Sequence, residues 1–143
     1  MTGDMVMTPS GWTPALALGH AEIDSQHQEL FRRVARLLEA MLHGDRVAIS
    51  QLFEFLGMYV VDHFAAEERL MRESDFPGYT VHKAAHERFV RDYQALRKLH
   101  EESGKSAGGA VAVKARTWLS EWLRNHIGST DQLLAQHLLQ RAS

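Results

Sequence analysis

The sequence contains no cysteine, which excludes disulfide bonds, thiolate metal ligands and a thiol nucleophile. A metal bound by this chain would therefore have nitrogen and oxygen ligands. No apolar run approaches the length that spans a bilayer, and the start of the chain, MTGDMVMTPSGW, lacks a basic segment followed by an apolar stretch. We therefore expect a cytoplasmic protein with no membrane partner.

An excess of charge of one sign is also missing. The 16 Lys and Arg residues against 18 Asp and Glu residues give a formal net charge of -2, and no basic run could follow a phosphate backbone. Nucleic acid is therefore not expected as a partner. The 143 residues suit one domain with its own hydrophobic core, which we expect to be a monomer.

Proline is sparse, and it separates an N-terminal arm from the rest of the chain. Pro9 and Pro14 keep residues 1–19 out of regular helix, and Gly19 ends this arm. We expect the arm to pack along a single domain formed by residues 20–143.

Apolar residues at helical period predict four helices after the arm. The first is predicted to have Asp24 as its N-cap and to end at Gly44, and the second to begin at Asp45. Turn residues at 74–78 separate the second helix from the third, which is predicted to begin near Tyr79 or Thr80.

The stretch at residues 101–110, EESGKSAGGA, is predicted to be a surface loop before the fourth helix. Short connections favour antiparallel neighbours. We therefore predict an all-α fold, an up-down-up-down antiparallel four-helix bundle.

Seven ionisable side chains interrupt the apolar stripes of these helices, where a hydrated group has no reason to lie. They are His27, His63, Glu67, His82, His86, His126 and Asp131. Residues four apart lie one above the other on a helix, so His63 and Glu67 can direct two ligands at one point. The same spacing relates His82 to His86. One such pair arises often by chance, but the seven groups together favour a metal site.

His126 and Asp131 are five residues apart, which rotates them by about 140° on a regular α-helix. Gly128 lies between them and would permit a π-bulge or a loosened turn that brings the two side chains together. On spacing alone, an ordinary exposed Asp131 remains an alternative. His27, taken by itself, is equally compatible with a hydrogen-bonded histidine of the core.

The donor types narrow the choice of metal. Mg²⁺ and Ca²⁺ prefer oxygen ligands, and one Zn²⁺ would use only three or four of the seven groups. Two metals bridged by the carboxylates would use them all, and iron suits this donor set better than copper, manganese or zinc. The chain has no Glu-x-x-His motif, which is not compatible with the ferritin-like type of di-iron site.

Four segments of the sequence resemble the hemerythrin family, in particular its bacterial single-domain members. They are IDSQHQELF around His27, HFAAEERLM around His63, HKAAHERF around His82, and WLRNHIGSTD around His126. The resemblance extends in order over nearly the whole chain after residue 11. It implies a four-helix bundle and a non-haem centre of two Fe ions with an oxo or hydroxo bridge, at which O₂ binds reversibly.

The resemblance also implies a role for each ligand. His82, His86 and His126 would hold one iron, His27 and His63 the other, and Glu67 and Asp131 would bridge them. O₂ would bind at the open position of the iron with two histidines. The apolar wall of the O₂ pocket would be formed by Leu30, Phe64, Trp122, Leu123 and Ile127.

Four further histidines match no ligand position. His20 stands where relatives usually carry an aliphatic residue, so it bears on the packing of the arm. His43, His100 and His137 are expected to be solvated or partly buried at the surface.

The expected function is reversible O₂ binding for oxygen storage, transport or delivery, with no enzyme activity. Two alternatives remain open: an O₂ or redox sensor that acts through a separate partner, and a di-iron enzyme that scavenges peroxide or nitric oxide.

Overall fold

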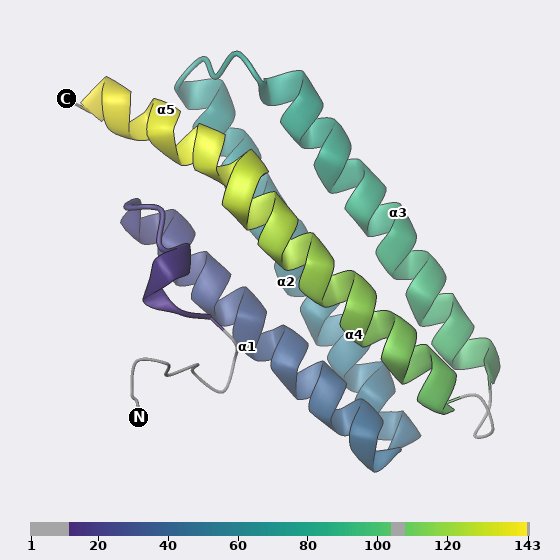
Figure 1. Ribbon diagram of the computed structural model, residues 1–143. Coiled ribbons are helices and arrows are strands. Elements are labelled where there is room, and N and C mark those ends of the chain that lie inside the picture. The colour runs from purple at the N-terminus through teal and green to yellow at the C-terminus, as the bar shows by residue number, and fades with distance from the viewer. Residues whose placement is uncertain (1–11, 104–107, 143) are drawn as a thin grey trace, which may run out of the picture.

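The computed structural model describes residues 12–103 and 108–142, and this part of the chain is helical without a strand. A short 3-10 helix, η2, precedes the longer helices. The elements are η2 (Pro14–Leu16), α1 (Ala21–His43), α2 (Arg46–Glu73), α3 (Tyr79–Ser103), α4 (Gly108–Asn125), η4 (His126–Asp131) and α5 (Gln132–Ala142). η4 is a π-helical turn that joins α4 to α5 as one continuous rod (Figure 1).

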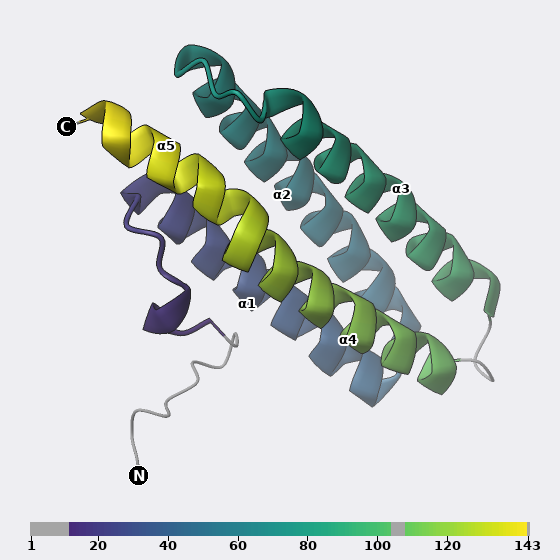
Figure 2. The same cartoon turned by 45° about the horizontal axis from the view of Figure 1, so that its top comes forward.

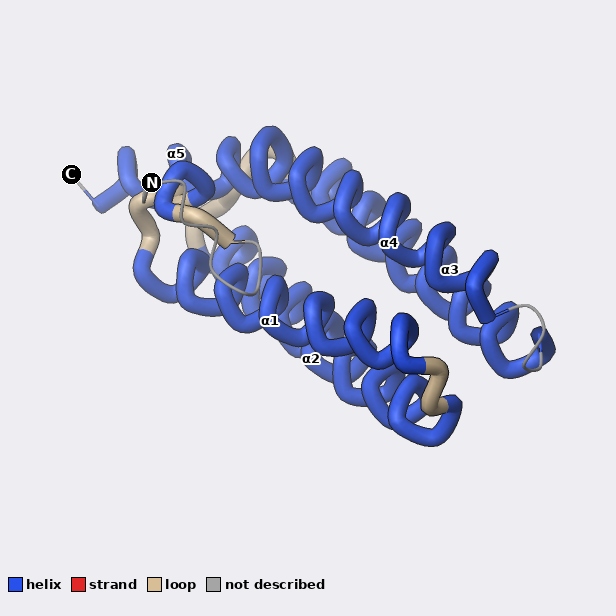
Figure 3. The backbone as a smooth tube through the Cα atoms, turned by 60° about the horizontal axis from the view of Figure 1, so that its bottom comes forward, coloured by secondary structure: helices blue, strands red, loops and turns tan. Residues whose placement is uncertain are grey.

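Four rods run alternately up and down and form the predicted antiparallel four-helix bundle (Figures 1 and 2). α1 packs on α2, α2 on α3, α3 on α4, and α4 returns to α1, so each rod has two neighbours. The described turns, between α1 and α2 and between α2 and α3, lie at opposite ends of the bundle (Figure 3). This leaves the middle of the bundle free of loops and enclosed by four helical faces.

Local sequence signals set two helix boundaries as predicted. Gly44 ends α1 in the left-handed conformation, with φ of 74°, which costs glycine little. The carboxylate of Asp45 then caps α2 by accepting a hydrogen bond from the backbone N–H of Ala48 at 3.1 Å. α3 begins at Tyr79, where the sequence predicted it.

The predicted N-cap of α1 is wrong. His20 is the N-cap, and its Nδ1 accepts a hydrogen bond from the backbone N–H of Ile23 at 3.3 Å. Asp24 lies one turn inside the helix and reaches back toward the arm. Its carboxylate accepts hydrogen bonds from the backbone N–H of Leu18 at 2.7 Å and of Gly19 at 3.1 Å.

The predicted loop at residues 101–110 is wrong at both ends, because α3 continues to Ser103 and α4 already begins at Gly108. Val111 and Ala112, the fourth and fifth residues of α4, are buried in the core. Packing of this apolar pair extends the helix into a stretch whose local composition favours a loop. The central part of the predicted loop, residues 104–107, lies outside the described residues.

One core cluster runs along the bundle and includes residues of all four rods. The described part of the arm lies against it, since Trp12, Leu16 and Leu18 pack on this cluster. Among the described residues, no helix is both long and apolar enough to cross a membrane.

His100 was expected at the surface, and this prediction is wrong. It is buried in the core, and its ring stacks on Phe53 with 5.4 Å between the ring centroids. It follows Leu96 by four residues, so it continues the inner face of α3. His43 is exposed and His137 is half-buried, as predicted.

Candidate metal centre

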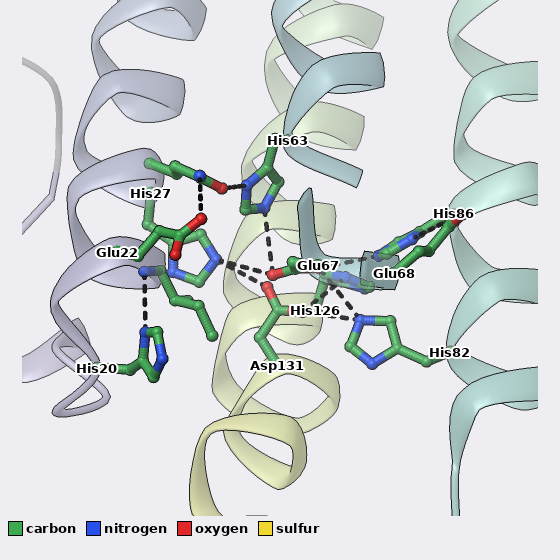
Figure 4. Close-up of polar contacts among 12 residues, drawn as sticks. His20, Glu22, His27, His63, Glu67, Glu68, His82, His86, His126 and Asp131 are labelled. Carbon is green, nitrogen blue, oxygen red and sulfur yellow. Dashed lines mark hydrogen bonds and ion pairs between the residues drawn. The ribbon is translucent and has the colours of Figure 1, made fainter. Parts of the chain in front are cut away.

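The seven predicted ligands come from four elements and meet inside the bundle (Figure 4). His27 comes from α1, His63 and Glu67 from α2, His82 and His86 from α3, and His126 and Asp131 from the two ends of η4. All seven are buried, and none exposes more than 5% of its surface. The structure therefore brings together every residue of the predicted set.

The pairs spaced four residues apart face one point, as helical geometry requires. His63 Nε2 lies 3.3 Å from Glu67 Oε2 on the same helix. On α3, His82 Nε2 and His86 Nε2 lie 3.3 Å and 3.0 Å from the other oxygen of the same carboxylate, Glu67 Oε1. Glu67 thus contacts histidines on both sides of it.

The π-helical turn brings His126 and Asp131 together, with 3.0 Å between His126 Nε2 and Asp131 Oδ1. The predicted π-bulge is confirmed, and the alternative of an exposed Asp131 is wrong because this residue is fully buried. Ser129 Oγ donates a hydrogen bond to the carbonyl oxygen of Asn125 at 2.6 Å within the same turn. A side chain at Gly128 would meet no neighbouring atom within 4 Å, so space alone does not require glycine there.

The donor atoms fall into two sets that share both carboxylates. One set is Glu67, His82, His86, His126 and Asp131, and the other is His27, His63, Glu67 and Asp131. Within each set, the donor atoms lie within 4.8 Å of one another, which suits ligands around a common ion. His27 Nε2 lies 2.8 Å from Asp131 Oδ2, so Asp131 also spans the two sets.

Several of these donor atoms are close to one another without forming hydrogen bonds, although they are buried. His86 Nε2 lies 3.0 Å from Glu67 Oε1, and His126 Nε2 lies 3.0 Å from Asp131 Oδ1, yet neither nitrogen has a hydrogen-bond partner among the described residues. Burying such atoms without a partner is costly. Nitrogen and carboxylate oxygen are the donors that transition metals prefer, so the seven residues fit two bridged metal ions.

The carboxylates and histidines of the centre shift each other's pKa. Burial alone would lower the pKa of His27 and His82, but hydrogen bonds and charges from Asp131 and Glu67 outweigh it and raise both values to about 9. Burial has the opposite effect on the carboxyl groups and by itself would raise the pKa of Glu67 and Asp131. The charges and hydrogen bonds of the facing histidines outweigh it and hold both pKa values below the usual range. Burial lowers the pKa of His126.

Two residues that the sequence did not single out support the ligands from outside. Gln26 Oε1 accepts a hydrogen bond from His63 Nδ1 at 2.7 Å, and Glu68 Oε2 accepts one from His86 Nδ1 at 3.0 Å. Gln26 directly precedes a ligand and Glu68 directly follows one. A metal-bound histidine usually donates the N–H that points away from the metal to an oxygen of a neighbouring group. A polar residue next to a predicted ligand in the sequence was therefore a signal that could have identified Gln26 and Glu68.

Four residues of the predicted pocket wall lie in the main core cluster, and the fifth, Trp122, packs against it. Leu30, Phe64, Leu123 and Ile127 are buried, whereas Trp122 is half-buried. Phe64 stacks on His86 with ring centroids 3.8 Å apart, and Trp122 stacks on His126 at 4.3 Å. Aromatic rings of the predicted wall therefore cover His86 and His126.

Fold and site together define a helical bundle with an internal cluster of histidines and carboxylates that can hold metal ions. The family model described as "Hemerythrin HHE cation binding domain" matches residues 18–138. The chain belongs to the hemerythrin family, as the resemblance of its sequence segments predicted.

Curated relatives and solved structures agree with this assignment. The chain is 32% identical to a bacteriohemerythrin of Stenotrophomonas maltophilia over 89% of this chain and 80% of that protein. It is 31% identical to a myohemerythrin of Riftia pachyptila over 88% of this chain and 91% of that protein. The crystal structure of a wild-type hemerythrin matches with a TM-score of 0.77 and 28% identity, covering 89% of this chain and 95% of that chain.

Proposed function

We propose that this protein binds O₂ reversibly at a centre of two non-haem irons and serves oxygen storage, transport or delivery. One observation carries the proposal: two sets of buried donors share Glu67 and Asp131, which is the arrangement that two bridged ions require. Family membership supports iron as the metal. When bound, the two irons supply the electrons that reversible O₂ binding needs.

The unequal number of histidines supports one site for O₂. His82, His86 and His126 would provide three nitrogens to one iron, whereas His27 and His63 would provide two to the other. Because the second set has fewer protein donors, we propose that O₂ binds in that half. Glu67 and Asp131 would hold the two irons together.

The apolar wall would keep water and protons away from bound O₂. Leu30 and Ile127 are almost fully buried and offer no hydrogen-bond donor from their side chains. The aromatic rings of Phe64 and Trp122 stack on histidines of the three-nitrogen set and shield them from solvent. A dry wall favours release of O₂ unchanged.

The test is an absorption spectrum of protein loaded with iron under anaerobic conditions, recorded before exposure to O₂, after exposure and after removal of O₂. Iron analysis should find about two irons per chain. A visible band that appears with O₂ and disappears on its removal is expected. Irreversible conversion to the diferric spectrum would overturn the proposal in favour of a sensor or a scavenging enzyme, the two alternatives that use the same centre.

The wall can be tested with a matched pair of variants on α1. Leu30→Ser places a hydroxyl in the proposed wall, whereas Leu37→Ser places the same group on the same buried face of α1, about 10 Å further along the helix. We expect the O₂-dependent band to decay faster only in Leu30→Ser, with two irons in both proteins. Equal decay in the two variants would contradict the assigned wall.

A further inference from the structure

In two of the predicted ligand histidines, the nitrogen that points away from the centre, Nδ1, is hydrogen-bonded to a side chain. These two side chains differ in charge. His86 Nδ1 donates to the carboxylate of Glu68 at 3.0 Å, whereas His63 Nδ1 donates to the neutral amide oxygen of Gln26 at 2.7 Å. Among the described residues, the buried Nδ1 atoms of His27 and His82 have no hydrogen-bond partner. Each proposed half of the centre therefore contains one histidine whose Nδ1 is hydrogen-bonded to a neighbouring side chain. This side chain is a carboxylate in one half and a neutral amide in the other.

These contacts also fix which nitrogen faces the centre. His63 Nε2 lies 3.3 Å from Glu67 Oε2, and His86 Nε2 lies 3.0 Å from Glu67 Oε1. With Nδ1–H directed outward, each Nε2 presents its lone pair to the centre (Figure 4). The hydrogen bonds to Gln26 and Glu68 thus select the tautomer that can bind metal.

The amide of Gln26 is itself oriented by charged neighbours. Its Nε2 lies 3.5 Å from Glu22 Oε2, and Glu22 is held at the surface by Arg69 at 3.0 Å. The amide nitrogen therefore faces Glu22, and the amide oxygen remains for His63. Tyr59 Oη donates to the backbone carbonyl of Gln26 at 3.1 Å and holds this turn of α1 against α2.

Glu68 occupies a different environment, a groove of about 590 Å³ between α2 and α3 that Phe64 and His86 also line. Its side chain is 17% exposed, so the carboxylate keeps contact with solvent while it accepts from His86. Phe64 stacks on the His86 ring with the planes only 5° apart, which limits rotation of that ring. The orientation of His86 is therefore set both by stacking on Phe64 and by the hydrogen bond to Glu68. Of these two residues, only Glu68 places a negative charge beside the ring.

We infer that Glu68 and Gln26 are positioning residues that make the two halves of the centre unequal in donor strength. A carboxylate that accepts the outer N–H of an imidazole makes this ligand more basic, and a neutral amide does so less. His86 is therefore the stronger donor and favours the oxidised metal in the set with three histidines. His63 leaves the metal of the other set more easily reduced. The inference rests on the proposed function, since it requires two redox-active irons.

The test separates charge from orientation. Glu68→Gln keeps a hydrogen-bond acceptor for His86 but removes the charge, and Gln26→Glu adds a charge behind His63. The ratio of diferric to diferrous protein is measured at equilibrium with a redox mediator, alongside iron content. Glu68→Gln should retain two irons and lower this ratio by about tenfold, the lower end of the change in metal affinity or activity that follows loss of such a partner. Gln26→Glu should raise it.

Glu87→Gln is the matched control, because Glu87 lines the same groove on the exposed side of α3 and makes the same change of charge. It should leave the ratio unchanged. The effects should also be local, so that Glu68→Gln alters one of the two iron signals in the Mössbauer spectrum and Gln26→Glu the other. Glu68→Ala, which removes both charge and acceptor, should in addition lower iron content.

Two results would overturn the inference: Glu68→Gln shifts the ratio no more than Glu87→Gln does, or Glu68→Gln and Gln26→Glu shift it in the same direction. Wild-type protein with two irons but no reversible O₂ band would overturn the proposed function alone, and the ratios would still decide this inference. Wild-type protein that takes up no metal would overturn both.

Discussion

Glu67 and Asp131 are the residues on which both halves of the centre depend. Glu67 contacts His63 through Oε2 and His86 through Oε1, and Asp131 contacts His27 through Oδ2. Loss of either carboxylate removes a donor from both sets at once, whereas loss of one histidine weakens one set.

Glu67→Ala and Asp131→Ala are therefore expected to lower the iron content from about two per chain to one or less. Asp62→Ala is the matched control, because Asp62 is an exposed carboxylate on the same helix as Glu67. Iron analysis after loading and removal of unbound metal measures the effect. Two irons retained in either bridging variant would contradict the shared-carboxylate arrangement.

Protons bound by the histidines of the metal-free protein make metal uptake dependent on pH. The pKa of His27 and of His82, about 9 each, lies above neutral pH, so both are protonated in the metal-free protein at pH 7. Metal binds neutral imidazole, so loading at pH 7 should release about two more protons than loading near pH 10, because the protons released when water forms the bridge are the same at both pH values. Titration with metal in weakly buffered solution measures this difference, and equal release at the two pH values would contradict it.

The same pKa shifts determine the direction in which the stability of the metal-free protein changes with pH. Since both folded pKa values lie above the ordinary value of 6.5, their contribution is present below pH 6.5 and is lost as pH rises through about 9. Glu67 and Asp131 have lowered pKa values, so their contribution is lost when the pH falls far enough to protonate them.

At the scale of the element, the π-helical turn η4 sets the direction of Asp131. A π-helical turn behaves as one extra residue inserted into an α-helix, which aligns residues five apart instead of four. The residues after the turn continue as a helix in the same rod, and Leu134 among them is buried in the core.

Deleting Ser129 should therefore be tolerated, because it leaves His126 and Asp131 four apart on a regular helix, where they again share a face. Inserting Ala after Ser129 while deleting Gln132 keeps the register of α5 but turns Asp131 by about 100°. We expect two irons in the first variant and fewer in the second. The opposite order of iron contents would show that the π-helical turn does not act through the direction of Asp131.

The start of α1 depends on Asp24 more than on its N-cap. Asp24 accepts hydrogen bonds from the backbone N–H groups of Leu18 and Gly19, whereas His20 accepts one longer bond, at 3.3 Å, from Ile23. Asp24→Ala should lower the free energy of unfolding by about 1 kcal/mol, and His20→Ala by less. Denaturant unfolding of the metal-free proteins compares them, and a larger effect for His20→Ala would contradict this order.

At the scale of the whole molecule, a bound metal centre would connect all four rods. α1, α2, α3 and the α4–α5 rod each contribute at least one ligand, so a bound metal would link every helix of the folded state and none in the unfolded state. Binding to the folded state alone shifts the folding equilibrium toward it.

The loaded protein should accordingly melt at a higher temperature than the metal-free protein. A metal concentration of about 100 times the dissociation constant adds about 2.7 kcal/mol, or roughly 10 °C for a domain of this size. Mg²⁺, which prefers oxygen ligands, is the control and should shift the melting temperature little. Equal melting temperatures with and without iron would exclude a centre shared by the four rods.

The sequence by itself determined the bundle and the pairs of candidate ligands spaced four residues apart, because both are expressed in local spacing. Apolar residues at helical period predicted the helices, and Gly44 and Asp45 carry the turn and cap chemistry that separates α1 from α2. Residues four apart share one face of any α-helix, so the convergence of His63 and Glu67 could be predicted without knowledge of the fold.

Tertiary structure alone decided what depends on contacts between helices. The spacing of His126 and Asp131 allowed a π-bulge or an exposed carboxylate, and burial of Asp131 against His27 of α1 selected the first. The contacts of Gln26 with His63 and of Glu68 with His86 also join different helices. Local sequence signals extend over one or two turns of a helix, whereas these side chains meet only when the helices pack, which is why the sequence could not choose their partners.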